Sequence, residues 1–291
     1  MRYYMGPDVW EPTVRDIETA GHECVESLAE AEVYINTSSD VSEVPELPEN
    51  IQWVQYCFTG VNDFIDAGII QPGGVPWCNS AGAFAKPVAE SALGLLLSQA
   101  HHHKAFALAK SWSVSKELDE SQVWLYDQQG PKHVVIVGAG GIGKQLIAYL
   151  KPFNVTITAV NRSGRTVEGA DATLPIERVD EVWGNADFVV SILPATAETE
   201  HFFNAEVFGA MKSTAVFINV GRGSTVVTDD LVEALRTGQI AGAGLEVVDP
   251  EPLPDGHPLY DLPNATLTPH MAASFQVAQH HMGAILSLIH I

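Results

Sequence analysis

A glycine-rich turn between a buried strand and a helix constrains the fold of this chain more than any other feature. The apolar run KHVVIVG (132–138) is typical of a strand buried on both faces, and a helical pattern follows it. Between them GAGGIG (138–143) places Gly138, Gly140 and Gly143 in the spacing G-x-G-x-x-G. Alone the spacing is a weak signal, but between a strand and a helix it predicts a dinucleotide-binding turn.

Each glycine of this turn has a physical role. The first makes the tight turn, the second lets the backbone approach a pyrophosphate, and the third lets the helix pack closely on the strand. The backbone N–H groups of Gly141 and Ile142, at the positive end of the helix dipole, then face the anion. The alternative is a tight turn that holds no ligand.

Strands and helices alternate along the rest of the chain. We expect further strands at 31–37, 51–58, 155–160, 186–193, 213–220, 241–248 and 265–270. The apolar positions of 85–112 recur at helical spacing and predict one long helix. Continuous apolar strands that alternate with helices predict an α/β fold with parallel sheets covered on both faces, and a smaller α/β unit in the first 80 residues.

The charge of the chain excludes several classes of partner. Acidic residues number 36 against 15 basic ones, a formal net charge of −21 in 291 residues, which would repel nucleic acid and anionic membranes. A high-salt cytoplasm would favour such a surface, and an ordinary acidic enzyme is the alternative. The three cysteines have no paired or C-x-x-C spacing, so we expect no disulfide framework, no metal site and a reducing, cytoplasmic setting.

A basic segment follows the second strand of the predicted cofactor sheet. That strand ends at Asn161, where an NAD-specific site usually has an acid for the ribose hydroxyls. Asn161 is neutral, and Arg162, Ser163 and Arg165 follow it. A charge-assisted bond from arginine to a 2′-phosphate contributes about 1.5–3 kcal/mol, so the segment favours NADP(H) over NAD(H). A solvated loop is the alternative, and Asn161 could still bind an unphosphorylated ribose, so NAD(H) remains possible.

Three later residues each follow a predicted strand, and together they suit the reduction of a 2-oxo acid. Arg222 can hold a carboxylate with a fork of donors, His270 can donate a proton, and Glu251 can stabilise the imidazolium. Ligands of parallel sheets bind beyond the carboxyl ends of the strands, where all three can converge. Taken singly, each residue has an ordinary alternative: a surface ion pair, a solvated loop acid and a core histidine.

The order of motifs over nearly the whole chain resembles the D-isomer-specific 2-hydroxyacid dehydrogenase family. The motifs that carry the resemblance are FTGVNDF, NSAGAFAKPVAESALGLLL, VGAGGIG, ILPATAET, INVGRGS, AGAGLEVVDPEPLP, HPLYDLPNATLTPH and MAA. The resemblance implies two doubly wound parallel-sheet domains, a Rossmann cofactor domain and a smaller flavodoxin-like substrate domain, with the active site in the cleft between them. It places the substrate domain at 1–79 and 271–291 and the cofactor domain at 80–270.

The resemblance also assigns roles to single residues. It implies that Arg222 binds substrate, that His270 is the acid/base with Glu251 as its partner, and that backbone groups of Thr59 and Gly60 hold the substrate carboxylate. Cofactor contacts are implied at Pro194, Thr199, Val220, Gly221, Glu246 and Ala272. Glu246 occupies the position near the nicotinamide carboxamide where members usually have Asp, and its side chain is longer than that of Asp.

Family membership implies an activity and an assembly. The formate-oxidising branch has Gln where this chain has Glu251, so Glu251 favours a D-2-hydroxyacid dehydrogenase that reduces 2-oxo acids. Members are usually homodimers through the cofactor domain. Some relatives are dinucleotide-sensing corepressors, and such a binding protein is the alternative function.

The histidine runs and the tail depart from these patterns. His101, His102 and His103 are consecutive on the predicted long helix, where adjacent residues do not share a face, so we expect solvent or interface positions for them and for His280 and His281. The tail HHMGAILSLIHI (280–291) has no charged Asp, Glu, Lys or Arg. We expect it to be a truncated or altered end; if the tail is native, we expect weaker docking of the last helix.

Overall fold

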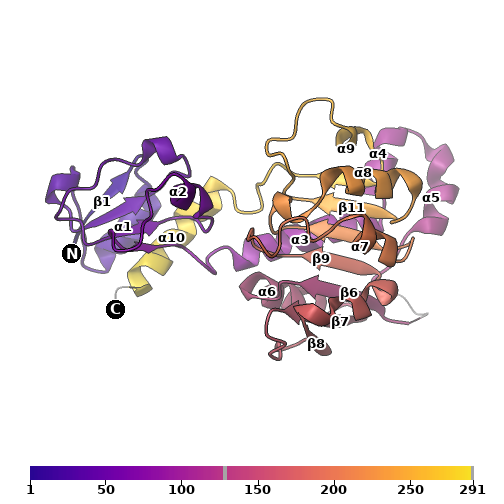
Figure 1. Cartoon of the computed structure of the whole chain (residues 1–291). Helices are drawn as coiled ribbons and strands as arrows, with labels where there is room; N and C mark the ends of the chain where they lie inside the picture. Colours follow the sequence, from indigo (N-terminus) through magenta and orange to yellow (C-terminus); the bar gives the residue numbers. More distant parts are fainter. Residues whose placement is uncertain (127–129, 290–291) are drawn as a thin grey trace. The chain divides into compact units, whose positions relative to one another are not determined.

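The computed structural model describes residues 1–126 and 130–289, which form two compact units (Figure 1). The first unit contains residues 1–84 and the segment from 273 onward, and the second contains residues 85–272. The boundaries therefore follow residues 84 and 272, whereas the sequence placed them after residues 79 and 270.

The first unit is a parallel five-stranded sheet in the order β2-β1-β3-β4-β5. This is the flavodoxin-like order expected for the smaller domain. Its elements are β1 (Arg2–Gly6), α1 (Glu11–Thr19), β2 (Glu23–Cys24), β3 (Val33–Asn36), β4 (Trp53–Tyr56), α2 (Asn62–Asp66), β5 (Trp77–Cys78) and α10 (Phe275–Ile289).

The last helix returns to this unit and packs on α1, against the expectation of weak docking. Thr13 Oγ1 donates to the carbonyl of Gln279 at 2.7 Å, and Ala278 and Met282 are fully buried. A Cβ on Gly283 would overlap the side chain of Asp16, so glycine permits the close approach of the two helices. Residues 290 and 291 of the unusual tail lie outside the described residues.

The second unit is a parallel seven-stranded sheet in the order β12-β11-β10-β9-β6-β7-β8. Its strands are β6 (Lys132–Val137), β7 (Val155–Asn161), β8 (Ala172–Pro175), β9 (Phe188–Ser191), β10 (Val216–Asn219), β11 (Gly242–Leu245) and β12 (Ala265–Leu267). Its α-helices are α3 (Ala85–Ala100), α4 (His103–Ala109), α5 (Ser115–Ser121), α6 (Gly141–Leu150), α7 (Ala205–Ala210), α8 (Thr228–Thr237) and α9 (Pro258–Asp261). The strand order reverses between β6 and β9, as in a doubly wound Rossmann sheet, which confirms the predicted fold class.

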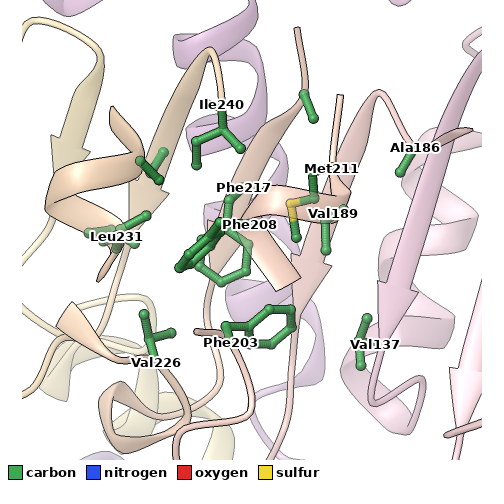
Figure 2. Packing of buried hydrophobic residues seen from close by; sticks show 14 of the residues in the cluster. Val137, Ala186, Val189, Phe203, Phe208, Met211, Phe217, Val226, Leu231 and Ile240 are labelled. Atoms are coloured by element: carbon green, nitrogen blue, oxygen red, sulfur yellow. The ribbon is translucent and has the colours of Figure 1, made fainter. Parts of the chain in front are cut away.

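Both faces of this sheet are buried, which explains the unbroken apolar strands. Val135 and Val137 of β6 belong to one core cluster, and Val134 and Ile136 belong to the cluster on the opposite face. Figure 2 shows the first cluster, where the rings of Phe203 and Phe208 lie 4.7 and 5.5 Å from that of Phe217. The sheet is therefore a rigid platform for the loops at its edge.

The predicted long helix over 85–112 is wrong as a single element. The α3 helix ends at Ala100, and His102 adopts a left-handed conformation with φ of 53° before α4 begins. The change of direction lets Lys104 Nζ donate to the carbonyls of Tyr260 and Ala265 at 2.8 and 2.7 Å. A tertiary contact therefore outweighs the helical periodicity of the sequence.

Candidate active site

The predicted site residues of the second unit follow parallel strands whose last residues are aligned across the sheet. The sheet register aligns Val137, Ser191, Asn219, Leu245 and Leu267, the last residues of five neighbouring strands. Because the strands are parallel, the segments after them emerge along the same edge of the sheet. This edge therefore brings together the glycine turn and the segments that carry Arg222, Glu251 and His270.

The glycine turn fits a dinucleotide pyrophosphate. Gly138 has φ of +91°, and a Cβ on it would lie 2.7 Å from the carbonyl oxygen of Ile192. Gly140 is exposed and precedes the first turn of α6, whose amide groups have no acceptor within the helix. A Cβ on Gly143 would press on Ala139 and Ile136 at 3.2 and 3.3 Å, so the helix packs close to its strand. The exposed backbone and the helix N-terminus are what an anion requires.

The basic segment after β7 is a closed turn with exposed arginines. Asn161 Nδ2 donates to the carbonyl of Arg165 at 2.8 Å, and its Oδ1 accepts from the Ser163 amide at 3.1 Å. The side chain of Arg165 donates to Ser163 Oγ at 3.1 Å. Arg162 and Arg165 are exposed, so both guanidinium groups can meet a phosphate from solution. Asn161 shapes this turn, a role that the sequence did not predict.

Arg162 also faces the loop after β9. The pKa of Glu198 is lowered from its usual value of 4.5, first by a hydrogen bond from its own amide, then by the Thr196 hydroxyl, with a contribution from the charge of Arg162. Thr199 Oγ1 donates to the carbonyl of Pro194 at 2.6 Å and closes this loop. Pro194 and Thr199 therefore shape a loop that lies near the basic turn.

The loop that carries Arg222 is held by a buried asparagine. Asn219 Oδ1 accepts from the Gly221 amide and Asn219 Nδ2 donates to the Arg222 carbonyl, both at 3.1 Å. The loop is also compressed by its neighbours, since a Cβ on Gly223 would lie 1.8 Å from the carbonyl oxygen of Val248. Asn219 was not among the predicted site residues, although a polar residue at the end of an apolar strand is a visible signal in the sequence.

Gly221 packs between strand ends and Val220 is buried beside it. A Cβ on Gly221 would lie 2.5 Å from the carbonyl oxygen of Leu193. The same segment, Ile192–Leu193, is the one that Gly138 approaches from the other side. Gly138 and Gly221 therefore fix the spacing of three loops at the edge of the sheet.

Glu251 and His270 form the predicted pair. His270 Nδ1 lies 2.6 Å from Glu251 Oε1, and their side chains are 47% and 41% exposed. The hydrogen bond with His270 is the main cause that lowers the pKa of Glu251 from its usual value of 4.5; burial opposes it, and the charges of His270 and Arg222 add to the lowering. A carboxylate that stays ionised can orient the imidazole and stabilise its protonated form.

Glu246, in contrast, is almost fully buried, with an exposed fraction of 2%. Its Oε2 accepts from Ser91 Oγ at 2.8 Å and from Thr268 Oγ1 at 2.5 Å. Its Oε1 accepts from the Ala272 amide at 2.5 Å. Ser91 and Thr268 were not among the predicted site residues, because nothing in the sequence around either residue points to Glu246.

Thr59 and Gly60 belong to the first unit. They follow β4 after two further residues, and Asn79 Nδ2 donates to the Thr59 carbonyl at 2.8 Å. Gly60 is exposed at the carboxyl end of its strand. Their role in holding a carboxylate stays a prediction.

The consecutive histidines do not have the geometry that the sequence suggested. His102 lies between two helices, and the rings of His101 and His103 stack with centroids 6.0 Å apart. His280 and His281 are exposed on α10. Among residues 1–126 and 130–289, no group of three or more His, Cys, Asp or Glu side chains is arranged to hold a metal ion.

Comparison with known proteins decides the family. The family model described as D-isomer specific 2-hydroxyacid dehydrogenase, NAD binding domain, matches residues 93–272. The chain belongs to the D-isomer specific 2-hydroxyacid dehydrogenase family. The match coincides with the unit that contains the glycine turn, so this unit is the nicotinamide dinucleotide domain.

Individual known proteins are similar to this chain over much of its length. An uncharacterised protein of Corynebacterium melassecola is 49% identical over 94% of this chain and 88% of its own length. A glyoxylate reductase of Pyrococcus horikoshii is 32% identical over 77% of this chain and 68% of its own length. The solved structure of a family member from Xanthobacter autotrophicus, in complex with NADPH and MES, covers 99% of this chain and 93% of its own, with a TM-score of 0.79 at 24% identity.

No described helix is both long and apolar enough to cross a membrane.

Proposed function

We propose that this dehydrogenase reduces 2-oxo acids to D-2-hydroxy acids with NADPH and accepts NADH as a second cofactor. The observation that carries the proposal is the contact of 2.6 Å between His270 Nδ1 and Glu251 Oε1, at the sheet edge that also holds the glycine turn. A histidine held by a carboxylate can act as a general acid in ketone reduction, and here it follows a strand of the same sheet that carries the glycine turn.

Each residue has a distinct task in this reaction. Arg222 binds the substrate carboxylate and polarises the carbonyl oxygen through its guanidinium group. When bound, the nicotinamide supplies the hydride that C2 receives. His270 donates a proton to the carbonyl oxygen, so the ketone gains a hydride and a proton and becomes a hydroxyl group. Glu251 keeps His270 in the orientation and the charge state that this step needs.

The turn after β7 supports the cofactor preference. Arg162 and Arg165 are exposed beside Asn161, and the turn has a neutral side chain where a carboxylate would repel a 2′-phosphate. The amide of Asn161 can hydrogen-bond to a ribose hydroxyl, which accounts for use of NADH. Gly140, Gly141 and Ile142 would hold the pyrophosphate through backbone amide groups at the start of α6.

NADPH oxidation with a panel of 2-oxo acids tests the proposal. We expect steady turnover with at least one acid, and we expect His270→Ala to lose that turnover while NADPH still binds. Tight NADPH binding without turnover of any acid would favour the dinucleotide-sensing alternative. Unchanged turnover in His270→Ala would refute the assignment of the acid/base. The homodimer, the cytoplasmic location and the high-salt setting remain predictions from the sequence.

A further inference from the structure

The carboxylate of Glu246 accepts hydrogen bonds from three groups of the protein. It accepts from two hydroxyl groups, those of Ser91 and Thr268, and from one backbone amide, that of Ala272. With 2% of its surface exposed, Glu246 is sealed from solvent. A buried carboxylate is stable only where donors replace the water that it has lost, and here three donors do so.

The partners of Glu246 lie on either side of His270. Thr268 is two residues before His270 in the chain, and Ala272 is two residues after it. The main chain of Glu246 adds a third contact, because its carbonyl accepts from the His270 amide at 3.0 Å. Glu246 therefore forms hydrogen bonds with the segment 268–272 at both of its ends and at its middle residue.

The backbone conformation of His270 requires contacts that hold it in place. Its φ is +51°, in the left-handed region that residues with a Cβ rarely adopt. A backbone of this kind persists only where the surrounding structure holds it, at a cost of about 1–3 kcal/mol. The bonds to Glu246 help to hold it, together with a second bond from the His270 amide to the Thr268 carbonyl at 3.0 Å.

We propose that Glu246 is a positioning residue, whose carboxylate holds the segment 268–272 so that the His270 ring meets Glu251. The inference rests on the proposed function, because it concerns the residue assigned as proton donor. It is distinct from the role near the nicotinamide carboxamide that family resemblance implies, because the hydrogen bonds that carry it join the carboxylate to Ser91, Thr268 and Ala272 of the protein itself.

The length of the glutamate side chain is essential to this role. Aspartate would draw the carboxylate back by one carbon–carbon bond, about 1.5 Å. Bonds of 2.5 to 2.8 Å would then exceed hydrogen-bonding distance for at least one of Ser91, Thr268 and Ala272. The Glu246→Asp substitution keeps the negative charge and changes only the length of the side chain.

The experiment compares Glu246→Asp with Glu246→Gln, and uses Glu233→Asp as the matched control. Glu233 is an exposed acid on α8 of the same unit. Five quantities are measured for each variant in the full-length protein: kcat and KM across pH, the Kd for NADPH, the Tm, and the NMR titration of the His270 ring without substrate. The His270 resonances are assigned with His270→Gln.

We expect Glu246→Asp to lower kcat by about 100-fold, the usual penalty for misplacing a reacting group by about 1 Å. The Kd for NADPH should stay within about 3-fold, because the glycine turn does not depend on Glu246. The pH profile of kcat and the NMR titration of the His270 ring should both differ from those of the wild type, because a displaced ring loses its contact with Glu251. Glu233→Asp should change none of these quantities.

Three outcomes would overturn the proposal. One is a weakening of NADPH binding in proportion to the loss of kcat, with the pH profile unmoved, as a direct cofactor contact would produce. Another is a lower Tm with unchanged kinetics and an unchanged His270 titration, as a purely structural role would produce. The third is wild-type behaviour of Glu246→Asp and Glu246→Gln. If the wild-type protein reduces no 2-oxo acid, the proposed function fails, while the His270 titration still decides whether Glu246 positions the ring.

Discussion

His270 Nδ1 contacts Glu251 Oε1 at 2.6 Å, although the two residues stand on loops that follow different strands. Glu251 lies in the loop after β11, and His270 follows β12. The contact engages Nδ1 and leaves Nε2 as the ring nitrogen for the proton transfer in the proposed reaction. The orientation of the ring therefore depends on how two separate loops are held.

Replacing the carboxylate of this pair should reduce catalysis without affecting the cofactor. We expect Glu251→Gln to lower kcat/KM for 2-oxo acids by about 100-fold, because the neutral amide does not stabilise a protonated imidazole. The Kd for NADPH, measured by fluorescence titration, should be unchanged. Glu206→Gln on the exposed first turn of α7 is the control and should match the wild type. Full activity of Glu251→Gln would remove the pair from the mechanism.

The contact between Glu251 and His270 also predicts how the stability of the protein changes at acid pH. The pKa of Glu251 in the folded protein is lowered from its usual value of 4.5, mainly by the hydrogen bond with His270. The folded protein therefore binds this proton less readily than the unfolded chain, so the stabilisation is present above pH 4.5 and is lost as the pH falls through the lowered pKa. We expect carboxyl ¹³C NMR to show a Glu251 midpoint below 4.5 that rises in His270→Ala. An unshifted midpoint in that variant would contradict the contact.

Cofactor preference should respond to one exposed arginine. We expect Arg162→Ala to weaken NADPH binding by about 10-fold, the lower end for a charge-assisted bond at an exposed site, while the Kd for NADH stays the same. Arg178→Ala is the matched control, because Arg178 is an exposed arginine of the same unit that pairs with Glu181. Undiminished NADPH affinity in Arg162→Ala would show that the basic turn does not recognise the phosphate.

The spacing of the loops should depend on a single glycine. A Cβ on Gly223 would lie 1.8 Å from the Val248 carbonyl oxygen, so Gly223→Ala must push two loops apart. We expect a loss of about 2 kcal/mol in the free energy of unfolding, within the range for overpacked sites, together with a higher KM for substrate because Arg222 moves. Gly209→Ala on α7 has open space around the new Cβ and should leave the Tm equal or higher. Equal Tm values for the two variants would refute the close approach.

The sequence by itself determined the fold class, the family and the candidate residues. These rest on local signals: the apolar strand before Gly138, the glycine spacing, and the position of Arg222, Glu251 and His270 just after strands. Such local signals predict the candidate site because parallel strands place their carboxyl ends on one edge of the sheet, whatever the details of packing. The same signals failed at His102, where a helical pattern continues through a left-handed residue.

Only the tertiary structure decided how those residues are held. Ser91 and Glu246 are 155 residues apart in the chain, and nothing in either neighbourhood predicts their hydrogen bond. Likewise Gly223 is required by the carbonyl of Val248, on a different loop. Periodicity and turn chemistry report what a residue does to its own segment, whereas close approaches and buried hydrogen bonds depend on which segments packing brings together. Candidate site residues can therefore be proposed from the sequence, whereas the residues that hold them in place emerge only from the fold.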